Sequence, residues 1–259
     1  MAEFAQQVLS LRIGDKHCSY AITDKSGNQL LQLSYYELEE NDLNPGSAVS
    51  EKLNLDGSSF YKVRISFDFP ESTLVPGPLF NRDDAGILLK NLYGVNGSRA
   101  IISESITEWQ VYNVYAVPGK ILDWVNKSFA TGKYWHQYTI SLPKIEAADP
   151  AGHLMVDIRQ HDCMVLVAAG GKLLLAQTFE YSSPEDVLYY LLKICQEFGL
   201  SQLEVRLSLS GLLDKQSVLY KELYQYFMRV EFREASWKAD KEYPSHFFTS
   251  LNDLAQCES

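Results

Sequence analysis

The feature that most restricts the fold of this chain is a pattern of three short β-rich segments that occurs twice in the sequence. The first copy spans residues 8–38 and the second spans residues 153–181. In both copies, short turns of polar residues or glycine separate the segments, which is typical of an antiparallel meander. At an offset of roughly 145 residues Cys18 aligns with Cys163, and this indicates an internal duplication. We therefore expect two related halves, each of which begins with three antiparallel strands.

The residues that follow the second copy predict a regular alternation of helices and strands. One helix should begin at Ser183, because proline and acidic residues occupy its first turn, and should end at Gly199. The other elements expected in this half are a strand at 203–209, a helix at 214–227, a strand at 229–233 and a short helix at 246–255. The resulting βββαβαβα order is that of the ribonuclease H-like fold, an α/β fold with mixed sheets.

The first half is less regular, and it contains extra residues relative to the second. A polar stretch occupies residues 39–59. After it we expect strands at 61–69 and 72–75, a helix at 83–93, a strand at 108–117 and a helix at 119–129. Residues 147–152, Ala-Ala-Asp-Pro-Ala-Gly, have the composition of a linker. We place the first half, with its insertion, at residues 1–150 and the second half at residues 151–259.

Composition and charge exclude several classes of function. Hydrophobic residues make up 46% of the chain, enough for a sizeable core, and the formal net charge is −10. That charge argues against nucleic acid as a partner, since binding a phosphate backbone depends on Lys and Arg. No stretch approaches the roughly 18 apolar residues of a membrane span, and the N-terminus lacks the pattern of an export signal. The scattered cysteines indicate reduced thiols in the cytoplasm, and we expect Cys18, Cys163 and Cys195 to be buried.

Apolar side chains near the C-terminus are expected to pack into the core. The last helix has an apolar stripe made of Phe247, Phe248, Leu251 and Leu254. Its polar face lacks the Lys and Arg that would attract anionic lipid, so we predict docking on the core and no membrane contact. Most aromatic residues of the preceding helix should also be ordinary core, because a tyrosine ring packs while its hydroxyl reaches water. These residues are Tyr220, Tyr224, Tyr226 and Phe227.

Two tandem ribonuclease H-like halves, the first with an insertion, resemble the superfamily of actin, heat-shock chaperones and sugar kinases. The stretch Ser-Thr-Leu-Val-Pro-Gly-Pro-Leu-Phe at residues 72–80 and the Leu-Ser-Gly at residues 209–211 add to this likeness. The chain is most similar to a Bacteroidetes family of unknown function with the actin-like ATPase fold. The resemblance covers essentially the whole chain and implies that fold.

The resemblance also implies where phosphates would be held. In the superfamily the first turn of each half cradles phosphates and follows an Asp-x-Gly triplet, in which the carboxylate directs a metal and glycine allows close approach of backbone N–H groups. The first half has Arg12-Ile13-Gly14, which keeps the glycine and replaces the carboxylate by arginine. The second half has Asp157-Ile158-Arg159, which keeps the carboxylate and replaces the glycine. The paired glycines that contact adenosine are reduced to Gly211.

These positions define a candidate ligand site in the cleft expected between the halves. Its residues are Arg12, Gly14, Asp15, Lys16, His17, Asp157, Arg159, Gln160, His161 and Gly211. The enzyme hypothesis is a magnesium-dependent ATPase or small-molecule kinase, with Asp157 as the catalytic, metal-associated carboxylate and the Lys and Arg side chains on the phosphates. The binding hypothesis is a non-catalytic actin-like protein that acts through protein contacts or through weak ligand binding in the cleft.

The two arginines favour the binding hypothesis. Arg12 reverses the charge where magnesium would be directed, and Arg159 fills space that phosphates would need. We therefore expect no metal and no ATP as cofactors, and we predict that Arg12 attracts Asp157 so that ion pairs replace a magnesium nucleotide. A protein is the partner that this hypothesis implies.

Two other metal chemistries have partial signals in the sequence. A two-metal nuclease needs several carboxylates around its ions, and the second half offers Asp157 with Glu204 at a strand start and Ser210 at the strand end. That cluster is incomplete. His161 and Cys163 are two residues apart and would share one face of a strand, but the spacing usual for zinc ligands is absent. The cysteines are better explained as repeated core and the histidines as exposed turn residues.

Overall fold

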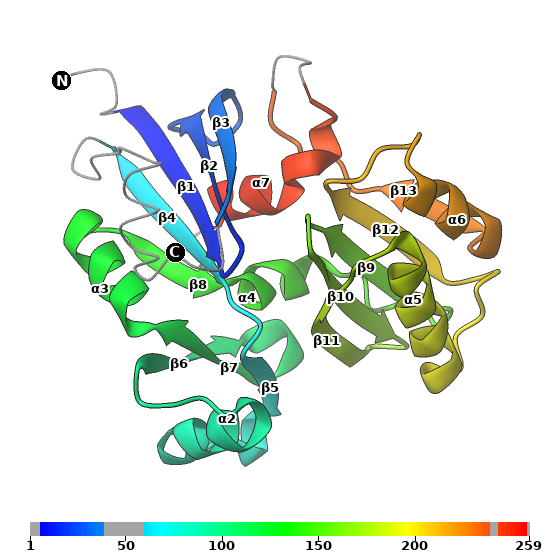
Figure 1. Cartoon of the computed structure of the whole chain (residues 1–259), viewed down its shortest axis with the longest axis horizontal. Helices are drawn as coiled ribbons and strands as arrows, with labels where there is room; N and C mark the ends of the chain where they lie inside the picture. The colour runs from blue at the N-terminus through cyan, green and yellow to red at the C-terminus, as the bar shows by residue number, and fades with distance from the viewer. Residues whose placement is uncertain (1–5, 39–59, 239–242, 258–259) are drawn as a thin grey trace. The chain divides into compact units, whose positions relative to one another are not determined.

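The computed structural model describes residues 6–38, 60–238 and 243–257, which form two compact units (Figure 1). The first unit comprises residues 1–140, 237–239 and 251–259, and the second comprises residues 141–236 and 240–250. The first range ends at residue 140, and the end of the chain also belongs to the first unit, while the division expected at residue 150 stays a prediction. The polar stretch at residues 39–59 lies outside the described residues.

A five-stranded mixed sheet forms the centre of the first unit, in the order β3-β2-β1-β4-β8. The first three strands pair antiparallel, and β4 and β8 run parallel to β1. The strands are β1 (Gln7–Gly14), β2 (His17–Asp24), β3 (Leu30–Glu37), β4 (Lys62–Asp68) and β8 (Lys133–His136). The antiparallel meander predicted for the first copy is therefore confirmed.

The second unit repeats this sheet, with the order β11-β10-β9-β12-β13. Its strands are β9 (His153–Ile158), β10 (Asp162–Ala169), β11 (Lys172–Glu180), β12 (Arg206–Gly211) and β13 (Arg229–Phe232), and its main helices are α5 (Pro184–Phe198) and α6 (Val218–Tyr226). A capping box between Ser183 and Asp186 begins α5, and Gly199 ends it with a φ of 66°. Together with the C-terminal helix α7 (Thr249–Ala255), the predicted βββαβαβα order is confirmed.

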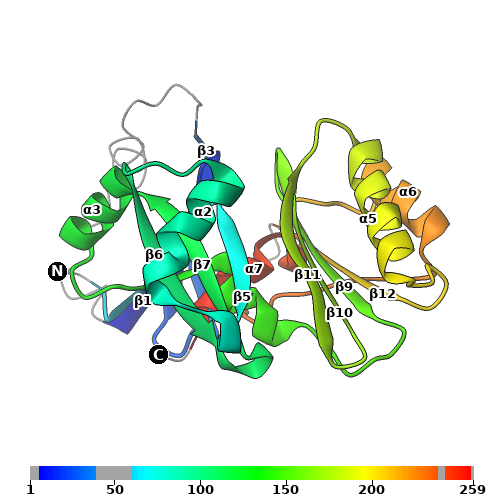
Figure 2. The ribbon, with the colours of Figure 1, turned by 90° about the horizontal axis from the view of Figure 1, so that it is seen from below.

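Alternation along the strands separates a packed face from a more polar face in each sheet. In the second unit, α5 and α6 lie together on one face of the sheet (Figure 2), over a core that includes Leu154, Val156 and Leu191. Leu191 and Leu207 are fully buried, whereas Leu188 is only partly buried. In the first unit, α3 (Gly119–Ser128) packs on the face of β1 and β4 that carries their apolar residues.

The insertion in the first unit folds as a separate three-stranded antiparallel sheet, ordered β5-β7-β6. Its elements are β5 (Ser72–Pro76), η3 (Gly77–Leu79), η4 (Arg82–Asp84), α2 (Ala85–Tyr93), β6 (Arg99–Ile106), η5 (Thr107–Trp109) and β7 (Val111–Pro118). Sequence patterns missed β6 and placed the start of β7 too early, because η5 and the positive φ of Gln110 interrupt the chain there. The short elements β8, α4 (Gln137–Ser141) and η6 (Leu142–Lys144) were also missed.

The predicted packing of the C-terminal segment is confirmed for two of its four apolar residues. Leu251 and Leu254 are buried, whereas Phe247 and Phe248, on the short 3-10 helix η7 (Ser245–Phe248) that precedes α7, are only partly buried. The cysteines Cys18, Cys163 and Cys195 are buried free thiols, also as predicted. Among the described helices, none combines the length and the apolar character needed to cross a membrane.

Candidate functional site

In the first unit the predicted site lies at the carboxyl end of β1, beside the carboxyl end of β4. These strands run parallel, and Gly14 is in register with Asp68. Residues two apart on a strand share a face, so Arg12 and Ser10 of β1 line the same face as Ser66 and Asp68 of β4. Ligands of open α/β sheets bind outside the carboxyl ends of the strands, so the predicted residues are at the expected end of the sheet.

Arg12 forms a buried ion pair with Asp68. Its Nε donates to Asp68 Oδ2 at 2.9 Å, and one of its Nη atoms lies 2.7 Å from the same oxygen. His17 Nε2 is 3.4 Å from that oxygen as well. All three residues are at most 7% exposed. A carboxylate of the same unit therefore neutralises the cation that occupies the metal-directing position, while the predicted attraction of Arg12 to Asp157 stays a prediction.

The side chain of His17 fills the turn after β1. A Cβ atom on Gly14 would lie 2.6 Å from Cε1 of His17 and 2.9 Å from the backbone oxygen of Asp68. Glycine is thus required here, because a Cβ atom would collide with the backbone of β4 as well as with the imidazole ring. Lys16 is half-buried beside it.

Acidic residues crowd the exposed end of the same turn. Burial, with the nearby carboxylates Glu71 and Asp68, raises the pKa of Asp15 to about 6, while Arg99 and Lys16 act in the opposite direction. Solvent still reaches part of Asp15, so we read the shift as the effect of a crowded surface and not of a sealed pocket. Glu71 is itself held by Arg99 through two contacts of 2.9 Å.

In the second unit, Asp157 is buried and held by a neighbouring strand. Its Oδ1 accepts a hydrogen bond of 2.9 Å from Oγ of Ser210, the residue in register with it on β12. Asp157 is 2% exposed. The carboxylate that is the catalytic candidate of the enzyme hypothesis is thus bonded to a serine hydroxyl at the carboxyl end of the strands.

Arg159 folds back onto the turn that it begins. Its guanidinium forms an ion pair and a hydrogen bond with Asp162, and its backbone oxygen accepts a hydrogen bond from the hydroxyl of Tyr181. Arg159 is 4% exposed, whereas the next residues of the turn, Gln160 and His161, are exposed. The long side chain expected to obstruct phosphates is therefore fixed by partners within its own turn.

A close backbone contact explains why glycine occupies position 211. Its φ is +88°, and a Cβ atom there would lie 2.0 Å from the backbone oxygen of Ile158. That oxygen accepts a hydrogen bond of 2.7 Å from the N–H of Leu212. The close approach of β12 to β9 requires glycine at this position, so its presence alone does not indicate an adenosine contact.

The residues considered for metal binding differ in position and burial. Burial raises the pKa of the Cys163 thiol to about 12, while His161 is exposed on the turn. Glu204 precedes the amino end of β12, whereas Ser210 and Asp157 meet at its carboxyl end. Within the described ranges, no cluster of three or more His, Cys, Asp or Glu side chains has the arrangement of a metal site.

Sequence reasoning located Arg12, Asp157 and Arg159 but missed their partners. Asp68 is 56 residues from Arg12. The alternation Lys-Val-Arg-Ile-Ser-Phe-Asp of β4 could have identified it as a polar residue at a strand end on the same face as Arg12. Asp162 is three residues after Arg159 and could have been found by spacing alone. Neither Glu71 nor Arg99 has such a signal.

Replacing Gly211 with alanine should destabilise the second unit strongly. Both this variant and Gly171→Ala place a side chain at positive φ, which costs about 1–2 kcal/mol. Gly171 has no atoms within 4 Å of the added Cβ, whereas Gly211 meets the backbone of β9. The clash should add about 1–3 kcal/mol to the loss at Gly211. Urea denaturation measures both, and equal losses would mean that the strands do not approach as closely as described.

The sequence and the fold were compared with known proteins. Residues 2–230 match a family model described as "Protein of unknown function (DUF3822)". No curated protein matches the sequence. A Bacteroides thetaiotaomicron protein with an actin-like ATPase fold and unknown function superposes with a TM-score of 0.80 at 19% identity, over 100% of both chains.

A second similar structure belongs to the PilM–PilN type IV pilus biogenesis complex, with a TM-score of 0.60, 14% identity and coverage of 96% of this chain and 97% of that one. At such identities the likeness shows the fold alone. The repeated five-stranded sheets and these comparisons confirm the resemblance found in the sequence. The chain has the actin-like ATPase fold and belongs to the family described as protein of unknown function (DUF3822).

Proposed function

We propose that this protein is a non-catalytic member of the actin-like ATPase fold that acts by binding, chiefly through contacts with another protein. One observation carries the proposal. A buried arginine lies at or just before the first turn of each unit, and it is paired with a carboxylate of the same unit. Arg12 is paired with Asp68 and Arg159 with Asp162. Neither arginine projects as an open anion-binding side chain.

These residues do not fit a magnesium nucleotide. A magnesium ion prefers carboxylate, phosphate and water oxygens in octahedral geometry, and Arg12 places a cation where such oxygens would be needed. Asp68 is bonded to that cation, and Asp157 accepts from Ser210. A metal on Asp68 would lie beside the guanidinium of Arg12, which repels it, and would compete for the carboxylate that compensates this buried cation.

Exposed apolar side chains on and after α6 of the second unit support a protein partner. We call them together the α6 surface, and they are Val218, Tyr224, Tyr226 and Met228, which are 49–68% exposed. Tyr224 and Tyr226 were expected to be mostly core, and the structure corrects this, because the residues that α6 buries are Leu219 and Leu223. Tyrosine and methionine are enriched in protein interfaces. The similar PilM–PilN structure is itself a complex of proteins.

Purified full-length protein should release no phosphate from ATP with magnesium above the level of its Asp157→Ala variant. Magnesium ATP should also leave the thermal midpoint unchanged. A ligand that did bind would, at a hundred times its Kd, stabilise the fold by about 2.7 kcal/mol. A phosphate-release assay and a thermal melt measure the two effects. Release that disappears in the Asp157→Ala variant would contradict the proposal and favour the ATPase or kinase.

The α6 surface should be needed for a stable partner. A Tyr224→Ser/Tyr226→Ser variant should keep its stability within about 0.5 kcal/mol, because the side chains are exposed. It should lose a protein that co-purifies stoichiometrically with the native chain. Tyr189→Ser is the matched control, since Tyr189 is 62% exposed on α5 of the same unit. Loss of the partner from the control alone, or from neither variant, would place the contact elsewhere.

A further inference from the structure

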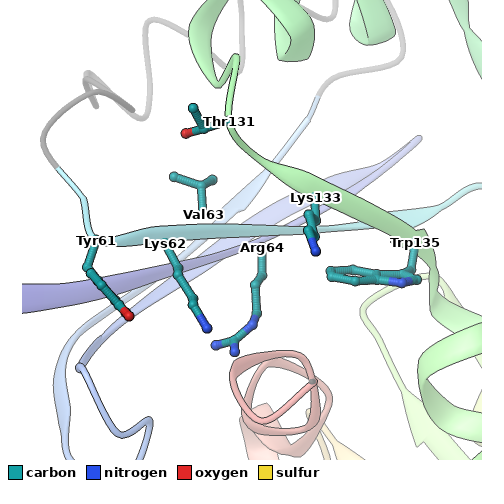
Figure 3. A pocket seen from close by; sticks show the side chains of 7 residues that line it. All are labelled: Tyr61, Lys62, Val63, Arg64, Thr131, Lys133 and Trp135. Atoms are coloured by element: carbon teal, nitrogen blue, oxygen red, sulfur yellow. The ribbon is translucent and has the colours of Figure 1, made fainter. Parts of the chain in front are cut away.

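A second site in the first unit lies far from the turn between β1 and β2. A cavity of about 210 Å³ opens where β4 and β8 begin (Figure 3). We call it the basic pocket, and its lining residues are Tyr61, Lys62, Val63, Arg64, Thr131, Lys133 and Trp135. It is at the amino end of β4, whereas Asp68 is at the carboxyl end, about 20 Å away for a seven-residue strand.

Strand geometry gathers the cations of the basic pocket on one face of the sheet. Lys62 and Arg64 are two residues apart on β4, and Lys133 is in register with Arg64 on the neighbouring parallel strand. Trp135 follows two residues later on β8 and shares that face. Figure 3 shows these four side chains on one side of the strands and Val63 on the other.

Two of the basic pocket's residues have evident structural roles. Arg64 Nη1 donates a hydrogen bond of 2.7 Å to the backbone oxygen of Ala255, the last residue of α7. A cation is favourable at that end of a helix, where backbone oxygens lack partners. The ring of Tyr61 lies under two ammonium groups, with Lys25 Nζ 4.3 Å and Lys62 Nζ 5.6 Å from its centroid.

In the described part of the chain Lys133 has no comparable role, and the charge of Lys62 faces the ring of Tyr61 without a carboxylate. Within the described part of the chain, neither ammonium group forms an ion pair. Like charges on neighbouring strands repel one another and destabilise a sheet. The concentration of three cations around one cavity is also unusual for a chain of net charge −10. Such an arrangement is favourable when an anion occupies it.

We propose that the basic pocket binds a small phosphate monoester that carries a flat ring. The two lysines supply charged donors for the phosphate oxygens, and Arg64 adds positive charge beside them; lysine and arginine are the usual residues near phosphate. Trp135 is half-buried on the same face and offers an aromatic surface for the ring. The volume is below the roughly 300–1,000 Å³ of sites for larger ligands, which suits one phosphate with one ring. This inference is independent of the proposed function.

Isothermal titration of the full-length protein with phenyl phosphate, inorganic phosphate and phenol tests the site. Phenyl phosphate should bind more tightly than inorganic phosphate, and phenol should not bind. A Lys62→Gln/Lys133→Gln variant should lose at least about tenfold in affinity, because a charge-assisted hydrogen bond contributes that much or more. Trp135→Leu should abolish the preference for phenyl phosphate over inorganic phosphate.

The matched control is Lys90→Gln/Lys127→Gln, which changes the net charge equally at exposed positions on α2 and α3. Its affinity for phenyl phosphate should equal that of the native chain. Because all four lysines are exposed, thermal melts should show every variant folded. The proposal would be overturned by an absence of phenyl phosphate binding at millimolar concentration. Equal weakening in the control, or no weakening in the pocket variant, would overturn it as well.

Discussion

The buried ion pair between Arg12 and Asp68 determines what the carboxyl end of the first sheet can hold. Both groups are nearly inaccessible to solvent, and His17 lies against the same carboxylate oxygen. Removing one partner from such a pair leaves a charge buried without compensation, which is far more costly than losing a surface salt bridge. The pair therefore constrains its surroundings: His17 packs against Gly14, and a metal ion at Asp68 would lie beside the charge of Arg12, which repels it.

In the second unit the polar side chains at the corresponding turn also have local partners, but the residues are different. It keeps the aspartate of the triplet, but Ser210 binds that carboxylate, and Arg159 is held by Asp162 and Tyr181 within the turn. Two sheets with the same strand order have thus acquired different side chains at corresponding turns, each satisfied locally. Polar groups with local partners gain little from an added nucleotide, since its contacts would have to replace bonds that already exist. A function in binding is consistent with both turns.

Elements with strong local signals could be predicted from the sequence. The meanders, α5 and the order of the second half follow from alternation, a capping box and a terminal glycine. The strands β6 and β8 could not, because one is half-exposed on both faces and the other has only four residues. In the candidate site the sequence identified the two arginines. It did not identify Asp68, although the alternation of β4 marks it as a polar residue at a strand end. The pairing of Asp68 with Arg12 and the burial of His17 could not be predicted, because they depend on the register of strands distant in sequence.

A double-mutant cycle on Arg12→Met and Asp68→Leu tests most directly whether this ion pair organises the site. Urea denaturation would give the free energy of unfolding for the native chain, both single variants and the double variant. Each single variant should lose about 3–5 kcal/mol, because the remaining charge stays buried without its partner. The double variant should lose much less than the sum, with a coupling energy of about 1.5–3 kcal/mol or more. Losses that simply add would contradict the account, since Arg12 and Asp68 would then act independently.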